Sequence, residues 1–393
     1  MVTVRDLMQL ECMRSLTLIA GERGLNKTVT KVGILDYEFT RIGSVYNVCW
    51  QGEFVLSSFL YAEGDPEAVL SGVKRLHRLK ATGLAIRNVF HFEITPEVIR
   101  YANQNNFPIF IMNDYELYFE DIIHAFYNLE THLLESDVKE KKLKDILRDR
   151  IDDTTAKKYA LEINAHFSNT FYAYYVVPIN EEGVHQLNHL LLCGIGKELE
   201  TNGNALMRYK NGAFFIHSVN QSKTKVDVTT YWHECLGLKP DKYQVGISNL
   251  QPFLHLMRKA LTESYFACCY AKLYGKAQCS FDDIGVYQVL FGISEDRQSK
   301  YLEAVVDPIL SYDRRTNSAL WETIMSYEMN NGNLKDIAQD LCTHENTVRY
   351  RMKKIYGLFE KDIHDINFEL ELMISVKLYR IHELLIGEPD FWG

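Results

Sequence analysis

The chain has 393 residues, with 43 basic against 52 acidic side chains, a formal net charge of −9, 47% hydrophobic and 24% charged residues. It is too long for one ordinary domain, so we expect two or three domains, each with its own core. The composition excludes a disordered chain, and the negative charge argues against a protein that coats nucleic acid non-specifically.

The opening residues carry no leader pattern, and no apolar stretch is long enough to cross a bilayer. We therefore expect a cytoplasmic protein without membrane contact. The eight cysteines include no Cys-x-x-Cys pair, which favours reduced and mostly buried thiols.

Residues 1–118 alternate apolar extended segments with amphipathic helices. Strands are predicted at 52–58, 83–87 and 107–112, and Asp65-Pro66 and Thr95-Pro96 each indicate the start of a helix. This alternation predicts a mainly parallel sheet that binds ligands where its strands end. Any one polar residue at such an end is more typical of a turn. The candidate ligand-binding residues at these ends are Ser57, Ser58, Arg87, Asn88 and Asn113.

The sequence pattern over residues 119–153 predicts a helical linker. Its apolar residues keep a spacing of three and four, as in Ile122, Phe126, Leu129 and Leu133. Packing into a core is the default explanation of this stripe. A coiled-coil-like dimer seam is the alternative, because the charged run 139–150 would lie outside a compact core.

The order of elements changes in residues 154–285. We predict strands at 171–177 and 243–247, helices at 184–199 and 251–274, and a hairpin over 205–217 that turns at Asn211-Gly212. His185 and His189 have the spacing of metal ligands on the first helix, but no third ligand is evident nearby. We therefore favour a surface pair and expect no metal or cofactor.

The sequence pattern over residues 333–355 predicts two short helices around a tight turn. Asn333 is a good N-cap for the first helix, and Thr343 can cap the second. Val348, Met352 and Ile355 form the inward stripe of the second helix. This spacing is typical of a helix-turn-helix.

The opposite face of the second helix carries side chains that suit DNA. Arginine can contact guanine and asparagine can contact adenine, whereas lysine, threonine and tyrosine suit phosphates. Residues 343–354 hold four basic side chains against one acid, which favours double-stranded DNA over a merely solvated helical pair. Arg351 lies beside the apolar stripe and fits a structural or phosphate role. The candidate DNA-binding residues are Thr343, Asn346, Thr347, Arg349, Tyr350, Lys353 and Lys354.

Asn333-Leu-Lys-Asp-Ile-Ala338 and His344-Glu-Asn-Thr-Val-Arg-Tyr-Arg351 resemble the C-terminal helix-turn-helix of the PucR/CdaR family of bacterial transcriptional regulators. Thr3-Val-Arg-Asp-Leu7 and Gly52-Glu-Phe-Val-Leu-Ser57 resemble the N-terminal domain of that family. The resemblance implies a multidomain α/β plus all-α fold: an N-terminal α/β sensor domain, a degenerate cyclase-like (GGDEF-like) α+β middle domain, and a helical C-terminal domain over 286–393.

The resemblance also implies a function. It implies a homo-oligomer, a dimer or higher, that binds operator DNA and controls a catabolic operon in response to a small-molecule effector. Purine-derived metabolites such as allantoin or allantoate come first as effectors, and sugar diacids next.

Catalysis is not implied. Lys210-Asn-Gly-Ala-Phe214 stands where a working diguanylate cyclase has Gly-Gly-Asp/Glu-Glu-Phe, so the metal-binding carboxylates are missing. The alternative function is a nucleotide-binding protein or enzyme that uses a purine nucleotide site retained in the middle domain. A further alternative is a scaffold whose basic face binds an acidic protein.

Overall fold

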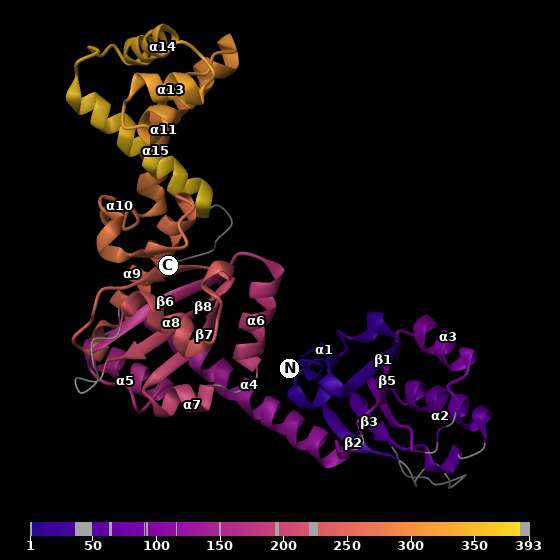
Figure 1. Cartoon of the computed structure of the whole chain (residues 1–393). Helices are drawn as coiled ribbons and strands as arrows, with labels where there is room; N and C mark the ends of the chain where they lie inside the picture. The colour runs from indigo at the N-terminus through magenta and orange to yellow at the C-terminus, as the bar shows by residue number, and fades with distance from the viewer. Residues whose placement is uncertain are drawn as a thin grey trace. The chain divides into compact units, whose positions relative to one another are not determined.

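The computed structural model describes residues 2–35, 49–62, 65–89, 91, 93–114, 116–148, 151–192, 196–219 and 227–385 (Figure 1). The chain forms two compact units. The first comprises Met1–Leu143, Glu162–His166 and Glu181–Tyr209, and the second comprises Lys144–Leu161, Phe167–Asn180 and Lys210–Gly393. No helix in the described ranges is long and apolar enough to cross a membrane.

A five-stranded sheet with the order β1-β5-β4-β3-β2 forms the centre of the first unit (Figure 1). Strands β2, β3, β4 and β5 are parallel to one another, and β1 pairs antiparallel to β5. The mainly parallel sheet predicted from the sequence is confirmed. Its strands are β1 (Leu16–Ala20), β2 (Lys31–Ile34), β3 (Glu53–Ser57), β4 (Gly83–Arg87) and β5 (Ile109–Met112).

Alternate residues of these strands build a core on each face of the sheet. On one face, Val55 and Leu84 pack with apolar side chains of α2 (Pro66–Arg78) and α3 (Pro96–Gln104). On the other face, Phe54 and Phe110 pack with α1 (Val4–Leu7) and with α4 (Phe119–Leu147). The sheet is therefore covered on both sides, as a parallel sheet requires.

Local signals set the start of α2. The side chain of Asp65 accepts hydrogen bonds from the N–H groups of Glu67 and Ala68 at 3.0 and 3.2 Å, and Pro66 is the first helical residue. Both features were predicted from the sequence, and they satisfy backbone donors that the helix itself cannot.

The apolar stripe of α4 belongs to the core. Ile122, Phe126 and Leu129 are at most 2% exposed and pack in the same cluster as Phe54 and Phe110. The default prediction of core packing is confirmed. These three side chains are therefore covered by their own unit, and a dimer seam elsewhere along the helix stays a prediction.

The first unit also contains α6 (Glu181–Leu192), α7 (Gly196–Thr201) and β7 (Asn204–Tyr209). The sequence predicted one helix over 184–199; the structure describes helix on both sides of residues 193–195, which lie outside the described ranges.

Four strands of the second unit pair in the order β10-β9-β6-β8. The central strand β6 is antiparallel to both β8 and β9, whereas β10 is parallel to β9. The sequence predicted neither β10 nor α8. These elements are β6 (Phe171–Pro178), β8 (Gly212–Ser218), β9 (Tyr243–Ile247), β10 (Gln278–Ser280), α5 (Asp153–Ile163) and α8 (Val228–Leu236).

Helix α9 (Met257–Leu273) packs on β6 and β9 at very short range. A Cβ atom at Gly246 would lie 2.0 Å from the carbonyl oxygen of Ser264 and 2.2 Å from the backbone nitrogen of Cys268. Only glycine permits this approach. The sheet therefore holds α9 by direct backbone contact.

The remainder of the second unit is helical. Helix α15 packs along α11 and α12 and also contacts α9 and α10 (Figure 1). Helix α15 is therefore a central packing element of the C-terminal helices. The helices are α10 (Tyr287–Leu290), α11 (Glu295–Thr316), α12 (Leu320–Met329), α13 (Leu334–Asp340), α14 (Glu345–Leu358) and α15 (Ile366–Leu385).

Candidate nucleic-acid interface

The two predicted short helices are α13 and α14, joined by a four-residue turn. Asn333 caps α13 by accepting a hydrogen bond from the N–H of Lys335 at 3.1 Å, as predicted. In the turn, Cys342 has a left-handed φ of 48°. The backbone reverses there within one residue, which places α14 across α13.

Thr343 does not cap α14. Its N–H donates to the carbonyl oxygen of Ala338 at 2.8 Å, so Thr343 closes the end of α13 and belongs to the turn. His344 is the cap, since its Nδ1 accepts a hydrogen bond from the N–H of Asn346 at 3.2 Å. The predicted Thr343 cap was wrong by one residue, because α14 begins at Glu345 and its cap position is therefore 344.

The inward face of α14 is the predicted one. Val348 and Ile355 are fully buried, and Met352 is 6% exposed. The helix contacts α11, α12 and α13. Because these three side chains return every third or fourth residue, they fix which face of α14 points to solvent.

The outward face carries five of the seven candidate DNA-binding residues. Asn346, Arg349, Tyr350, Lys353 and Lys354 are exposed. Tyr350 is the most prominent apolar member, with 67% of its surface exposed. The remaining candidates, Thr343 and Thr347, are half-buried at the N-terminal end of the helix. All seven thus lie on one side of the turn and helix.

The basic side chains on and beside this face make different contacts. The Arg349 guanidinium pairs with the carboxylate of Glu345 at 3.6 Å, and both side chains are exposed to solvent. The Lys354 ammonium lies 5.5 Å from the centre of the Tyr312 ring. Arg351 instead donates from Nη1 to Thr323 Oγ1 at 3.2 Å. Arg351 therefore has the structural role that its place beside the apolar stripe suggested.

Two family models match separate parts of the chain. The Purine catabolism regulatory protein-like family (PucR) matches residues 6–129, and the PucR C-terminal helix-turn-helix domain matches residues 320–378. The chain thus has an N-terminal region of the PucR type and a C-terminal helix-turn-helix of the PucR type. The second match contains α12, α13 and α14, so the exposed face of α14 lies inside the family's helix-turn-helix domain.

Two curated relatives of this chain come from Bacillus subtilis (strain 168). The DNA-binding transcriptional activator AdeR is 29% identical over 100 residues, 25% of this chain and 24% of AdeR. The proline-responsive transcriptional activator PutR is 24% identical over 145 residues, 36% of this chain and 35% of PutR. The matches thus span about a quarter of the first relative and about a third of the second.

One solved structure is also similar to the chain. It is the crystal structure of the regulator of polyketide synthase expression from Bifidobacterium adolescentis, with 15% identity and a TM-score of 0.31. The alignment covers 63% of this chain and 99% of that structure.

The candidate ligand-binding residues meet at one edge of the first sheet. Strands β3, β4 and β5 are parallel neighbours, with Ser57 beside Ile86 and Arg87 beside Met112. Their carboxyl ends therefore lie together. Ser57, Ser58, Arg87, Asn88 and Asn113 follow those ends, so the structure brings all five to the same edge.

The side chains at this edge have different surroundings. Ser57 is 1% exposed, and its Oγ accepts a hydrogen bond from the N–H of Phe59 at 3.0 Å. Because Phe59 has a left-handed φ of 52°, Ser57 holds a strained backbone turn in place. Ser58 and Asn88 are half-buried, and Asn113 is exposed.

Two further residues at this edge were missed. The Arg87 guanidinium lies 5.4 Å from the ring centre of Tyr118, and Asn113 Nδ2 donates to Thr17 Oγ1 at 2.6 Å. Thr17 could not be found from the chain order, because β1 joins the sheet antiparallel to β5 at a large sequence separation. Tyr118 directly precedes α4, where nothing in the pattern signals a ligand. The edge thus offers a cation, an aromatic ring and an amide.

The middle hairpin also differs from its prediction. It turns at Lys210–Asn211 and not at Asn211–Gly212, because Gly212 is already the first residue of β8. Lys210 has a left-handed φ of 49°, and its ammonium donates to the Tyr265 hydroxyl at 3.2 Å. Across the described ranges, no three His, Cys, Asp or Glu side chains gather to hold a metal ion.

Proposed function

We propose that this chain is a ligand-responsive, DNA-binding transcriptional regulator of a catabolic operon. The observation that carries the proposal is the exposed face of α14, with its asparagine, arginine and lysines, inside the matched helix-turn-helix domain. The chain as a whole is acidic, with a net charge of −9, so its DNA contacts would be confined to this face. AdeR and PutR, which are transcriptional activators by description, support the same class of protein.

The proposal includes a domain organisation. Residues 1–118 form the ligand-sensing domain, 119–153 a helical linker whose first part packs on that domain, 154–285 a degenerate GGDEF-like domain, and 286–393 the C-terminal domain with the helix-turn-helix. The antiparallel pairing of β6 with β8 and β9 supports the third assignment. The protein acts in the cytoplasm as a dimer or higher oligomer.

The effector binds at the edge formed by the ends of β3, β4 and β5. Arg87 and Tyr118 supply a cation beside an aromatic ring, and Asn113 supplies an amide held by Thr17. A planar, polar and anionic metabolite would satisfy all three groups. The family description makes a purine-derived metabolite the first candidate, and the proline response of PutR makes an amino acid the second.

The mechanism follows from the geometry of α14. In the major groove, Arg349 and Asn346 contact base edges, whereas Lys353, Lys354 and the two threonines contact phosphates. In a dimer, the two helix-turn-helix domains, called the heads below, occupy half-sites about one turn of DNA apart, or a multiple of it. The effector can change this binding only by stabilising one arrangement of the heads over another.

The deciding experiment titrates the purified full chain with the duplex upstream of its own gene, at two salt concentrations, against a scrambled duplex of the same length. We expect tight binding to the upstream duplex that weakens as salt rises. Equal affinity for both duplexes, with and without candidate metabolites, would refute the proposal. Turnover of GTP with a divalent metal would instead support an enzyme.

A further inference from the structure

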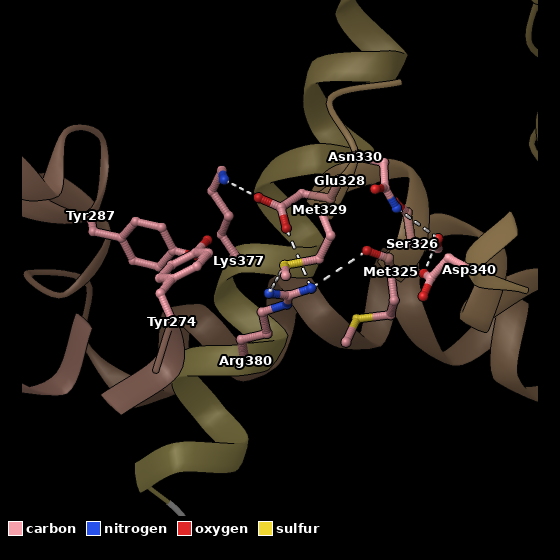
Figure 2. Close-up of polar contacts among 10 residues, drawn as sticks. All are labelled: Tyr274, Tyr287, Met325, Ser326, Glu328, Met329, Asn330, Asp340, Lys377 and Arg380. Carbon is pink, nitrogen blue, oxygen red and sulfur yellow. Dashed lines mark hydrogen bonds and ion pairs between the residues drawn. The ribbon is translucent and has the colours of Figure 1, made fainter. Parts of the chain in front are cut away.

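A buried carboxylate lies on α12, the helix that precedes the helix-turn-helix. The side chain of Glu328 is only 6% exposed. It accepts a hydrogen bond from the Lys377 ammonium and lies 3.5 Å from Nη2 of Arg380, and both cations come from α15 (Figure 2). A buried charge is stable only when its partners stay in place. The Glu328–Lys377–Arg380 cluster therefore fixes how α12 sits on α15.

The same two cations reach the sheet-bearing part of the second unit. The Lys377 ammonium lies 5.2 Å from the ring centre of Tyr287, which belongs to α10. The Arg380 guanidinium lies 6.0 Å from the ring centre of Tyr274, which ends α9. The two tyrosine hydroxyls are 2.8 Å apart, so the rings form one hydrogen-bonded pair (Figure 2). Each cation thus contacts a carboxylate on one side and an aromatic ring on the other.

On its opposite side, α12 is bonded to both helices of the helix-turn-helix. Ser326 Oγ donates to the carboxylate of Asp340 at the end of α13, and Asn330 Nδ2 donates to Ser326 Oγ at 3.1 Å (Figure 2). Thr323 Oγ1 accepts the bond from Arg351 of α14. A continuous series of polar contacts therefore runs from α9 and α10, through α15 and α12, to α13 and α14.

We propose that the Glu328–Lys377–Arg380 cluster is the joint that couples the α9–α10 region to the recognition helix α14. The inference deepens the proposed function and rests on it, because it names the regulatory connection of the same DNA-binding site. A change that moves the Tyr274–Tyr287 pair must either carry the two cations with it or separate them from the rings. In the first case α12, and with it Asp340 and Arg351, is displaced.

Coupling between two sites is reciprocal. If movement at Tyr274 and Tyr287 alters α14, then DNA bound to α14 must alter the protection of α9 and α10, although DNA does not touch them. This reciprocal effect distinguishes a joint from a cluster that only stabilises the fold.

The test uses hydrogen–deuterium exchange on the full chain with the Lys377→Met variant. This change keeps an unbranched side chain, shorter by one atom, and removes its charge. Lys300→Met is the matched control, because Lys300 pairs with Asp296 at 2.9 Å on α11 while both side chains stay more than 70% exposed. Tyr274→Phe is a milder second variant, which keeps the ring and removes the hydroxyl bond to Tyr287.

Without DNA, we expect Lys377→Met to speed amide exchange in α12 to α14 and also in residues 270–290, by about tenfold. Tyr274→Phe should produce a smaller change in the same two regions, and Lys300→Met should change neither. Faster exchange on only one side of the cluster, in both Lys377→Met and Tyr274→Phe, would overturn the inference.

With the upstream duplex bound, wild-type protein should show slower exchange in α14 and in residues 270–290. Lys377→Met should keep the first effect and lose the second. If the wild type shows no preference for that duplex, the proposed function fails, and the DNA-free comparison still decides whether the joint exists.

Discussion

Arg349 lies 3.6 Å from Glu345 in the free protein and must leave that carboxylate to contact a base. Breaking the Arg349–Glu345 ion pair costs little free energy, because an exposed ion pair contributes at most about 1 kcal/mol. We expect Arg349→Ala to weaken specific DNA binding by about 1–3 kcal/mol and to relax the preference at one base pair. Binding to a panel of single-base operator variants measures both effects. Unchanged affinity and preference would place the recognition face elsewhere, and Lys300→Ala on α11 serves as the control.

Val348 tests the inward face of the same helix. It is fully buried between α14 and its neighbours, whereas Tyr350, two residues later, is 67% exposed. Val348→Asp buries a charge without a partner, so we expect it to destabilise the C-terminal helices by more than about 3 kcal/mol. Tyr350→Asp should leave the thermal unfolding midpoint nearly unchanged. Cooperative unfolding of Val348→Asp at the wild-type temperature would show that position 348 does not face inward.

Tyr327 links α12 to the start of α15 and makes stability depend on pH. Burial, together with the hydrogen bond that its hydroxyl donates to Glu369 at 2.8 Å, raises the pKa of Tyr327 to about 12. The folded pKa is above the unfolded value near 10, so this contribution is complete below about pH 10 and disappears as pH rises towards about 12.

The matching measurement compares the free energy of unfolding of wild type and Tyr327→Phe by urea titration at several alkaline pH values. Wild type should be the more stable protein near pH 9, and the difference should shrink as pH rises through about 10 to about 12. Other groups that titrate in this range affect both proteins and cancel. A difference that stays constant would mean that Tyr327 ionises equally easily in both states.

At the level of secondary-structure elements, the α13–α14 turn places a non-glycine residue where glycine is favoured. Cys342 has a φ of 48°, a conformation that costs an L-residue about 1 kcal/mol. Cys342→Gly removes that strain but adds freedom to the unfolded chain. We expect a net stabilisation of about 0.5 kcal/mol, measured by urea unfolding. Cys342→Ala keeps the strain without the thiol and should not stabilise, so equal stabilisation by both changes would point to the thiol instead.

The elements that the sequence predicted well carry local signals. Asp65-Pro66 marks the start of α2, Asn333 the start of α13, and the Val348 stripe the inner face of α14. The elements that it missed depend on distant partners. Strand β10 is three residues long and forms only by pairing with β9. Helix α8 is the exception: it was missed although Tyr231, Trp232, Cys235 and Leu236 recur at helical spacing and Asp227 and Gly237 mark its ends.

The candidate sites show the same limit. The face of α14 follows from one helix, so helical periodicity places its residues correctly. The ligand edge needs three strands and a fourth, antiparallel one, and sequence order could suggest Arg87 and Asn113 but not their contacts with Tyr118 and Thr17. The Glu328–Lys377–Arg380 cluster forms only when α9, α10, α12 and α15 pack together. No sequence motif predicts it.

For the molecule as a whole, the salt dependence of DNA binding reports how many heads bind at once. The outward face of α14 offers two lysines to phosphates, Lys353 and Lys354, and the rest of the chain is acidic overall. Each neutralised phosphate contributes about −0.9 to the slope of log K against log salt concentration. One helix-turn-helix should therefore give a slope of about −2, and a dimer with both of them on DNA about −4.

The measurement is a titration of the full chain with a duplex that carries one half-site and with a duplex that carries two. If the protein binds as a dimer through α14, the slope should roughly double on the longer site, and Lys353→Ala should reduce it by about 0.9 for each head. A slope that is steep on both duplexes and insensitive to Lys353→Ala would place the phosphate contacts outside α14. That outcome would require a second basic surface on the rest of the chain, which is acidic overall.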